Sequence, residues 1–152
     1  VQERRLFETD GFFHEDGRAK FMFEDVMDVP ERPDGEYPYV LLTGRGSVTQ
    51  WHTLTRTDRA PLLKRASPDP AYVEINPHDA EETTIADGAS VAVSSRRGEV
   101  RVRAAVVGST SPGQVFMPMH FAHTNDLTLA SFDPYSRQPS FKHAAVAVEL
   151  AP

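Results

Sequence analysis

Cysteine is absent from all 152 residues of the sequence. This absence excludes a disulfide framework, a thiolate nucleophile, zinc held by cysteine and an iron–sulfur cluster ligated by this chain. No stretch of about 18 apolar residues is present to form a membrane-spanning helix, and there is no charged-then-apolar leader. The chain opens on Val1 rather than Met, which predicts a processed chain or a piece of a longer one.

The sequence patterns of common enzymes are also missing. There is no G-x-S-x-G elbow, P-loop or H-E-x-x-H, and no G-x-G-x-x-G with a downstream acid, so a Rossmann site is not expected. His120-x-x-His123 has a metal-ligand spacing, but no third ligand is evident and no cysteine can supply one. The residues alone therefore predict a binding surface, with no catalytic residue and no metal site.

Positive charge is scarce at the start of the chain. Residues 1–36 hold five Lys/Arg and eleven Asp/Glu, which accounts for the whole net charge of −6, whereas residues 37–152 hold eleven of each. Nucleic-acid binding needs a basic face that displaces counterions from phosphates. The charge pattern therefore excludes nucleic acid as an expected partner.

We call residues 1–36 the lead-in segment. Its phenylalanines flank the turn-forming stretch His14–Gly17, which predicts a small hairpin, and Pro30, Pro33 and Gly35 then form a linker. We expect this acidic segment to lie on the outside of a second unit, residues 37–152, and to be pinned there by its phenylalanines.

Short strands at close spacing dominate residues 37–152. Apolar or alternating runs predict strands near residues 39–43, 72–75, 91–93, 99–106, 115–117 and 144–150. Two short helices are predicted, one capped by Asp58 and running to Lys64, the other capped by Asn76 with Pro77 in its first turn. About six short strands with two small helices predict a mainly β fold closed into a barrel.

The stretch YVLLTGRGSVTQWHTLTRT predicts the first part of a binding surface. A glycine-containing turn after a strand leaves backbone N–H groups free to face an anion. Hydroxyls, an arginine fork, a flat indole and an imidazole follow, at Thr43, Gly44, Arg45, Trp51, His52, Thr53 and Thr55. The alternative is an ordinary turn and polar loop beside a core tryptophan.

Two later stretches add to this surface. MPMHFAHTNDLT places imidazole and amide groups, including His120 and Asn125, in a loop after a strand, where they could contact the edge of a heterocycle. DPYSRQPSFKH is stiffened by two prolines and presents Gln138 and Lys142. The alternative for this last stretch is a plain surface crossover.

The order of these motifs resembles one family. Strand–TGR–x4–WHTxTxT is followed by VEINPxDA–IxDGxxVxVSSRRGEVxVRA, by PGxVFMPxHF–TNxLT and by DPxSxQPxFK–AAVxV. This order resembles the C-terminal molybdopterin-guanine-dinucleotide-binding domain of oxidoreductases related to dimethyl sulfoxide reductase. RLFETDGFFHEDGRAKF resembles the segment that leads into that domain in nitrate reductases and formate dehydrogenases.

The resemblance implies a double-psi β-barrel like that of aspartate decarboxylase. It also implies that the domain helps to hold a bis-molybdopterin guanine dinucleotide cofactor, with molybdenum and a 4Fe–4S cluster carried by the remaining domains of a parent enzyme. The isolated fragment would then be inactive, and the parent is expected in the cytoplasm, with the periplasm as the alternative. The implied cofactor-binding residues are Thr43, Gly44, Arg45, Trp51, His52, Thr53, Thr55, His120, Asn125, Thr128, Gln138, Phe141 and Lys142.

Some positions depart from the family pattern. The usual W-H-T-G-T-M-T has Leu54 and Arg56 in place of glycine and methionine, and Thr84 stands where a glycine is often found. The ending TNxLT–FDPYSRQPSFK favours a nitrate reductase parent, and formate dehydrogenase is the alternative. Another class shares the fold: pyruvoyl-dependent decarboxylases cleave themselves at a Gly-Ser bond, which Gly46 and Gly108 each offer. A plain interaction barrel that uses the acidic front is a third interpretation.

Overall fold

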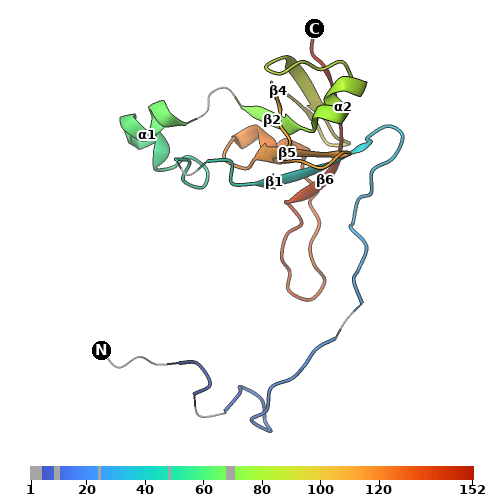
Figure 1. Ribbon diagram of the computed structural model, residues 1–152. Helices are drawn as coiled ribbons and strands as arrows, with labels where there is room; N and C mark the ends of the chain where they lie inside the picture. Colours follow the sequence, from blue (N-terminus) through green and yellow to red (C-terminus); the bar gives the residue numbers. More distant parts are fainter. Residues whose placement is uncertain (1–4, 9–10, 24, 48, 68–70) are drawn as a thin grey trace.

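The computed structural model describes residues 5–8, 11–23, 25–47, 49–67 and 71–152, so expectations that fall on the other residues lie outside it. Six strands form a closed barrel (Figure 1). In chain order the elements are β1 (Tyr39–Gly44), η1 (Thr57–Arg59), α1 (Pro61–Ala66), β2 (Tyr72–Ile75), α2 (Pro77–Glu82), β3 (Ser90–Ser94), β4 (Glu99–Val106), β5 (Gln114–Pro118), η2 (Ala122–Leu127) and β6 (His143–Leu150).

The barrel closes in the order β1-β5-β2-β4-β3-β6. The pairs β1/β5 and β2/β4 are parallel, and the remaining neighbours are antiparallel. Only β3 and β4 pair as a local hairpin, across the turn at Ser95–Gly98. The predicted mainly β barrel with short helices is confirmed.

Alternating side chains fill the barrel. Val91 and Val93 on β3, and Val100 and Val102 on β4, point inward, while Arg101 between them is exposed. This period of two places one face of each strand in the core and the other in water. The largest fully buried apolar side chains are Leu41, Val73, Ile75, Val91, Val93, Val115, Met117, Leu127 and Val146.

The two helices agree with their predicted starting residues to different degrees. Asn76 caps α2 as predicted, since its side-chain oxygen accepts from the His78 N–H at 2.9 Å. The first helix is shorter than expected: Asp58 lies inside the 3-10 turn η1 instead of capping a helix, and α1 begins only at Pro61. α1 buries none of its residues, and among the described residues no helix is long and apolar enough to cross a membrane.

The lead-in segment differs from its prediction. A turn closes where the Phe12 N–H donates to the Gly17 carbonyl at 3.0 Å, but the described residues before β1 form no strand. Phe13, Phe21 and Phe23 are exposed, and the segment runs away from the barrel (Figure 1). A two-stranded hairpin with no sheet or helix to pack on is marginal in water. The expectation that the phenylalanines pin this segment to the barrel is therefore wrong.

The junction of the lead-in segment with the barrel is held by charge instead. Glu31 accepts a hydrogen bond from the Ala145 N–H of β6 at 2.8 Å and pairs with Arg96 and Arg97. The hydrogen bonds from Arg97, from Ala145 and from Arg96 lower the pKa of Glu31 to about 2. This carboxylate is the point at which the acidic segment joins the barrel.

Candidate functional site

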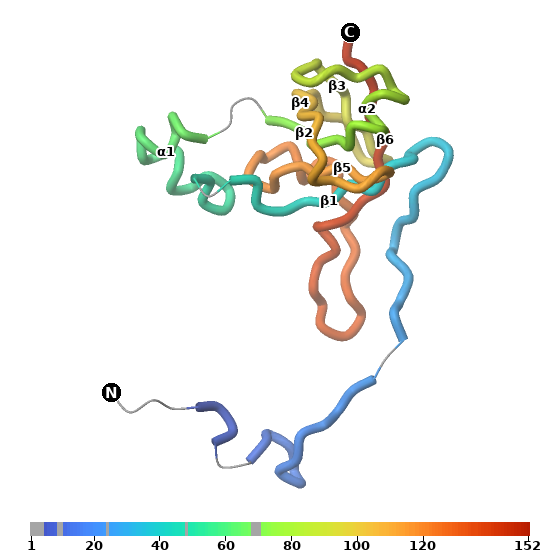
Figure 2. The backbone as a smooth tube through the Cα atoms, viewed as in Figure 1, coloured from blue at the N-terminus to red at the C-terminus, as the bar shows by residue number. Residues whose placement is uncertain are grey.

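The candidate site lies at one end of the barrel. Because β1 and β5 are parallel, they end side by side at Gly44 and Pro118. β6 runs antiparallel to β1 and therefore begins, at His143, at the same end. The described residues outside these strands, 45–47, 49–56 and 119–142, leave or enter the barrel there (Figure 2). The strand topology thus brings the three stretches predicted to form a binding surface to one end of the barrel.

A groove of about 480 Å³ opens between these stretches. It is lined by His52, Thr53, Met119, Asn125, Thr128, Leu129, Ala130, Ser131, Phe132, Pro139 and Phe141. Five of the residues implied by the family resemblance are in this lining: His52, Thr53, Asn125, Thr128 and Phe141. Each of the three stretches contributes at least one of them.

Three further implied residues join the stretches to one another. The Thr43 hydroxyl donates to the Phe141 carbonyl at 2.9 Å, and its N–H donates to the Lys142 carbonyl at 3.2 Å. The Gly44 carbonyl accepts from the Met119 N–H at 2.8 Å. Thr43 and Gly44 therefore fix the loop before β6 and the segment after β5 against the end of β1.

His120 is the third joining residue. Its side chain is buried, 2% exposed, and its Nε2 accepts from the Gly46 N–H at 3.3 Å. Its Nδ1 faces the His52 carbonyl. An imidazole that is hydrogen-bonded on both nitrogens is fixed in orientation, so His120 supports the loop that carries His52 and Thr53.

The other five implied residues lie outside the groove lining. Arg45 is exposed and lines a separate hollow with Glu74 and Gln114, so its role in cofactor binding stays a prediction. Trp51 is half exposed, and the Arg56 guanidinium covers its ring at 4.8 Å from the centroid. The remaining three, whose side chains are exposed, are Thr55, Gln138 and Lys142.

The lining of the groove is mainly apolar. Its walls are formed largely by Met119, Leu129, Phe132 and Phe141, and His52 is its only ionisable residue among the described part of the chain. The residues Leu129–Phe132 are not among the site residues predicted from the sequence. The one indication was that apolar residues continue beyond TNDLT without a strand pattern.

Two residues of the loop before the groove adopt the left-handed backbone conformation. His52 has φ 47° and Leu54 has φ 64°. A residue other than glycine is uncommon there because its Cβ approaches the backbone. Leu54 occupies the position at which the family pattern has glycine, so the loop keeps a glycine-type conformation without the glycine. The loop stores strain beside the groove.

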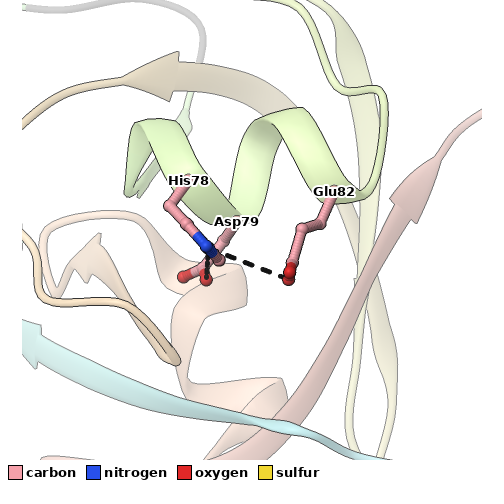
Figure 3. A group of neighbouring side chains, drawn as sticks. All are labelled: His78, Asp79 and Glu82. Atoms are coloured by element: carbon pink, nitrogen blue, oxygen red, sulfur yellow. Dashed lines mark ion pairs between the residues drawn. The ribbon is translucent and has the colours of Figure 1, made fainter.

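A cluster of polar side chains lies at the opposite end of the barrel. His78, Asp79 and Glu82 of α2 offer ligand atoms within 4.8 Å of one another (Figure 3). The His78 imidazole is 3.8 Å from each carboxylate, and the buried Asp79 accepts from the Gly113 N–H at 2.7 Å. These contacts explain the cluster as an anchor between α2 and the start of β5, and we assign it no metal.

The closed barrel with a groove at one end defines a ligand-binding domain of the double-psi type. A family model described as the molydopterin dinucleotide binding domain matches residues 39–145. The chain belongs to this family. The match confirms the resemblance drawn from the order of the motifs and favours it over the pyruvoyl-dependent decarboxylase alternative.

Three relatives show similarity over most of this chain. It is 37% identical to F420-dependent formate dehydrogenase subunit alpha of Methanocaldococcus jannaschii, over 95% of this chain and 22% of the relative. It is 40% identical to F420-dependent formate dehydrogenase 1 subunit alpha of Methanococcus maripaludis, over 88% and 20%. It is 38% identical to periplasmic nitrate reductase of Desulfovibrio desulfuricans, over 90% and 18%. The chain thus spans about a fifth of the length of these curated relatives.

A solved structure supports the fold. Acetylene hydratase from Pelobacter acetylenicus aligns with a TM-score of 0.63 at 14% identity, over 76% of this chain and 18% of that one. At such low identity the likeness concerns the arrangement of the backbone alone.

Proposed function

We propose that the groove holds the pterin portion of a molybdopterin guanine dinucleotide within a larger molybdenum oxidoreductase. The observation that carries the proposal is the convergence of three distant stretches on one groove, in a chain of the molydopterin dinucleotide binding family. A pterin is a flat heterocycle with a polar edge. It needs an apolar face to lie on and amide, hydroxyl or imidazole groups at its rim.

The residues present fit that requirement. Phe141 and Leu129 offer apolar surface, while Asn125, Thr128 and Thr53 offer an amide and two hydroxyls at the same groove. A volume of about 480 Å³, open on one side, suits part of a dinucleotide and leaves the remainder to other domains. When bound, the cofactor would supply the redox chemistry. These residues would bind and orient it.

The parent enzyme is proposed to be a nitrate reductase. The ending TNDLT–FDPYSRQPSFK supports this assignment. Formate dehydrogenase is the second candidate, because two of the relatives above carry that name at 37% and 40% identity. Molybdenum and a 4Fe–4S cluster would be held by other domains, since cluster ligation uses cysteine and this chain has none. We propose a cytoplasmic parent, and the periplasm is the alternative because one relative is named periplasmic.

The binding proposal is tested by cofactor content in the full-length protein. Asn125→Ala removes a rim amide and Phe141→Ala removes an aromatic face. We expect each to lower the pterin bound per protein about tenfold at limiting cofactor, since ring stacking on Phe141 contributes roughly 1–3 kcal/mol and a hydrogen bond from the Asn125 amide about 1 kcal/mol. Arg101→Ala is the matched control, because Arg101 is exposed on β4, pairs with Glu99 at 4.0 Å and is not among the residues that line the groove. Full pterin content in both groove variants would refute the proposal.

The substrate is a separate question with its own assay. The full-length protein is supplied with nitrate and a reduced dye, and in parallel with formate and an oxidised dye. Turnover with nitrate alone supports the nitrate reductase assignment. Turnover with formate alone replaces it with formate dehydrogenase and leaves the groove proposal intact.

A further inference from the structure

Arg97 lies at the turn between β3 and β4 and is not among the site residues predicted from the sequence. The guanidinium of Arg97 makes two parallel hydrogen bonds to the Glu31 carboxylate, Nη1 to Oε1 and Nη2 to Oε2, each 2.8 Å long. Such a bidentate, charge-assisted pair fixes both position and orientation. The side chain of Glu31 is only 9% exposed, so this pair is partly shielded from water.

The same guanidinium also reaches toward the groove. Arg97 Nε and Nη2 donate to the Leu127 carbonyl at 3.1 and 2.9 Å. Leu127 is the last residue of η2 and is fully buried. The next residues in the chain, Thr128 to Phe132, form one wall of the groove. Arg97 thus bonds the lead-in segment on one side and the base of the groove wall on the other.

The turn that carries Arg97 is packed closely against η2. A Cβ placed on Gly98 would lie 3.2 Å from the Asp126 carbonyl oxygen. The turn itself is braced, since the Ser95 N–H donates to the Gly98 carbonyl at 2.8 Å and the Arg97 N–H donates to the Ser95 hydroxyl at 3.2 Å. This close packing gives Arg97 a rigid base from which to hold Leu127.

We propose that Glu31 and Arg97 form a latch that sets the position of the groove wall, so that the lead-in segment controls the geometry of the groove without touching its ligand. Both are positioning residues. Glu31 orients the Arg97 guanidinium, and the guanidinium holds the Leu127 carbonyl, which directly precedes residues 128–132. The statement that this groove wall contacts a pterin rests on the proposed function. The latch between Glu31 and Arg97 does not depend on the proposed function.

Two other features of the junction support this assignment. Arg96 also pairs with Glu31, at 3.0 Å, and with Asp34, and its guanidinium covers the Tyr37 ring at 4.7 Å from the centroid. The lead-in segment is therefore held next to Arg97 by several contacts. Arg96 has no hydrogen bond to η2 among the described residues, so the link to the groove runs through Arg97.

Hydrogen exchange in the full-length protein tests the latch. The Thr128 and Ser131 amides are hydrogen-bonded, to the Asn125 and Leu129 carbonyls, so peptides that cover residues 126–132 report opening of the wall. Arg97→Ala should speed their exchange about tenfold, because hydrogen bonds from a charged donor are lost. Glu31→Ala should speed it about threefold or more, although Glu31 has no hydrogen bond to η2 among the described residues. Arg101→Ala should change nothing.

The double variant separates a latch from a merely structural role. With Arg97 already replaced, Glu31→Ala should add no further exchange at residues 126–132. If Glu31 only anchors β6 through Ala145, its removal will speed exchange at residues 143–146 and leave 126–132 unchanged, which would overturn the proposal. Independent, additive effects of the two substitutions would overturn it too. Should Glu31→Ala fail to fold, Glu31→Gln keeps one acceptor oxygen for the Ala145 N–H but loses the charge and the second acceptor for the Arg97 guanidinium.

Pterin content then distinguishes this inference from the proposed function. If Asn125→Ala and Phe141→Ala both retain full cofactor, the groove is not the pterin site, yet the exchange result still decides the latch. If Asn125→Ala loses cofactor, Arg97→Ala and Glu31→Ala should each lower it several-fold, and full retention in both would show that the latch does not control binding.

Discussion

Replacing the Glu31 carboxylate with an uncharged side chain should remove a pH-dependent contribution to the free energy of unfolding. In the folded chain its carboxylate accepts from Arg97, Ala145 and Arg96, and these bonds lower its pKa from 4.5 to about 2. At about 1.36 kcal/mol per unit, the depressed pKa corresponds to at most about 3 kcal/mol at neutral pH. Solvent screening reduces this to about 1–2 kcal/mol, because the side chain of Arg96 is 39% exposed.

The direction of the pH dependence follows from the sign of the shift. A pKa that is lower in the folded state than in the unfolded chain stabilises the fold when the group is ionised. The contribution of Glu31 is therefore complete above about pH 4.5 and is lost as the pH falls from there towards about 2. Glu31→Gln has the same shape and no charge, so it lacks this dependence.

Urea unfolding of the 152-residue chain and its Glu31→Gln variant between pH 2 and 7 measures the effect. We expect the wild type to be more stable at pH 7 and the difference in unfolding free energy to narrow by about 1–2 kcal/mol as the pH falls to 2. Asp133 also has a lowered pKa, caused mainly by backbone hydrogen bonds, but it is present in both proteins and cancels in the difference. The pKa of Asp34 is lowered mainly by backbone hydrogen bonds and is raised by the Glu31 charge, so its contribution cancels only in part. Parallel curves over the whole range would refute the reasoning.

Three further substitutions, and one control substitution, test local features by thermal unfolding. Thr84 has φ 56°, a strained conformation for a β-branched residue, so Thr84→Gly should raise stability by about 1 kcal/mol; a lower melting temperature would contradict this. Asp79→Asn should cost about 1–2 kcal/mol, because it weakens a buried acceptor that holds a backbone N–H at 2.7 Å; an unchanged melting temperature would show that the charge is dispensable. Gly46→Ala would place its Cβ 2.6 Å from Pro118 Cγ and should cost about 1–3 kcal/mol, whereas Gly108→Ala, with nothing within 4 Å, should be close to neutral. Equal effects at the two glycines would argue against the predicted clash.

The strands of the barrel could be predicted because the alternation of apolar and polar residues is visible within each short stretch of sequence. In β4 the alternation of Val100, Val102 and Ala104 with exposed arginines fixes which face is buried. The order of strands could not be predicted in the same way. The parallel pairs β1/β5 and β2/β4 join residues that are far apart in the chain, and no local pattern specifies them.

The lead-in segment shows why apolar residues can mislead. Phe21 and Phe23 predict packing, but a sequence does not say on what surface, and the structure leaves both exposed. Arg97 shows the converse. Its turn suggests an exposed hairpin, while the acid that holds it lies 66 positions earlier in the chain.

The sequence predicts the polar residues of the groove but not the apolar ones. Asn125 and Thr128 stand in a recognisable motif, and the topology does bring them together. Leu129 and Phe132 carry no chemical pattern that separates a groove wall from any other apolar pair. Arg45 has chemistry suited to an anion, but its side chain leaves the strand end toward a different hollow.

The order of strands around the barrel also sets the order of events in folding. β6 follows the other five strands in the chain, and it closes the barrel by pairing with both β1 and β3. Contacts between distant segments must overcome the entropy of loop closure before they stabilise anything, so they form slowly. The groove depends on the loop that enters β6, and hence on that final closure. We therefore expect the groove to form late in folding, and a ligand bound there would stabilise a barrel that has already closed.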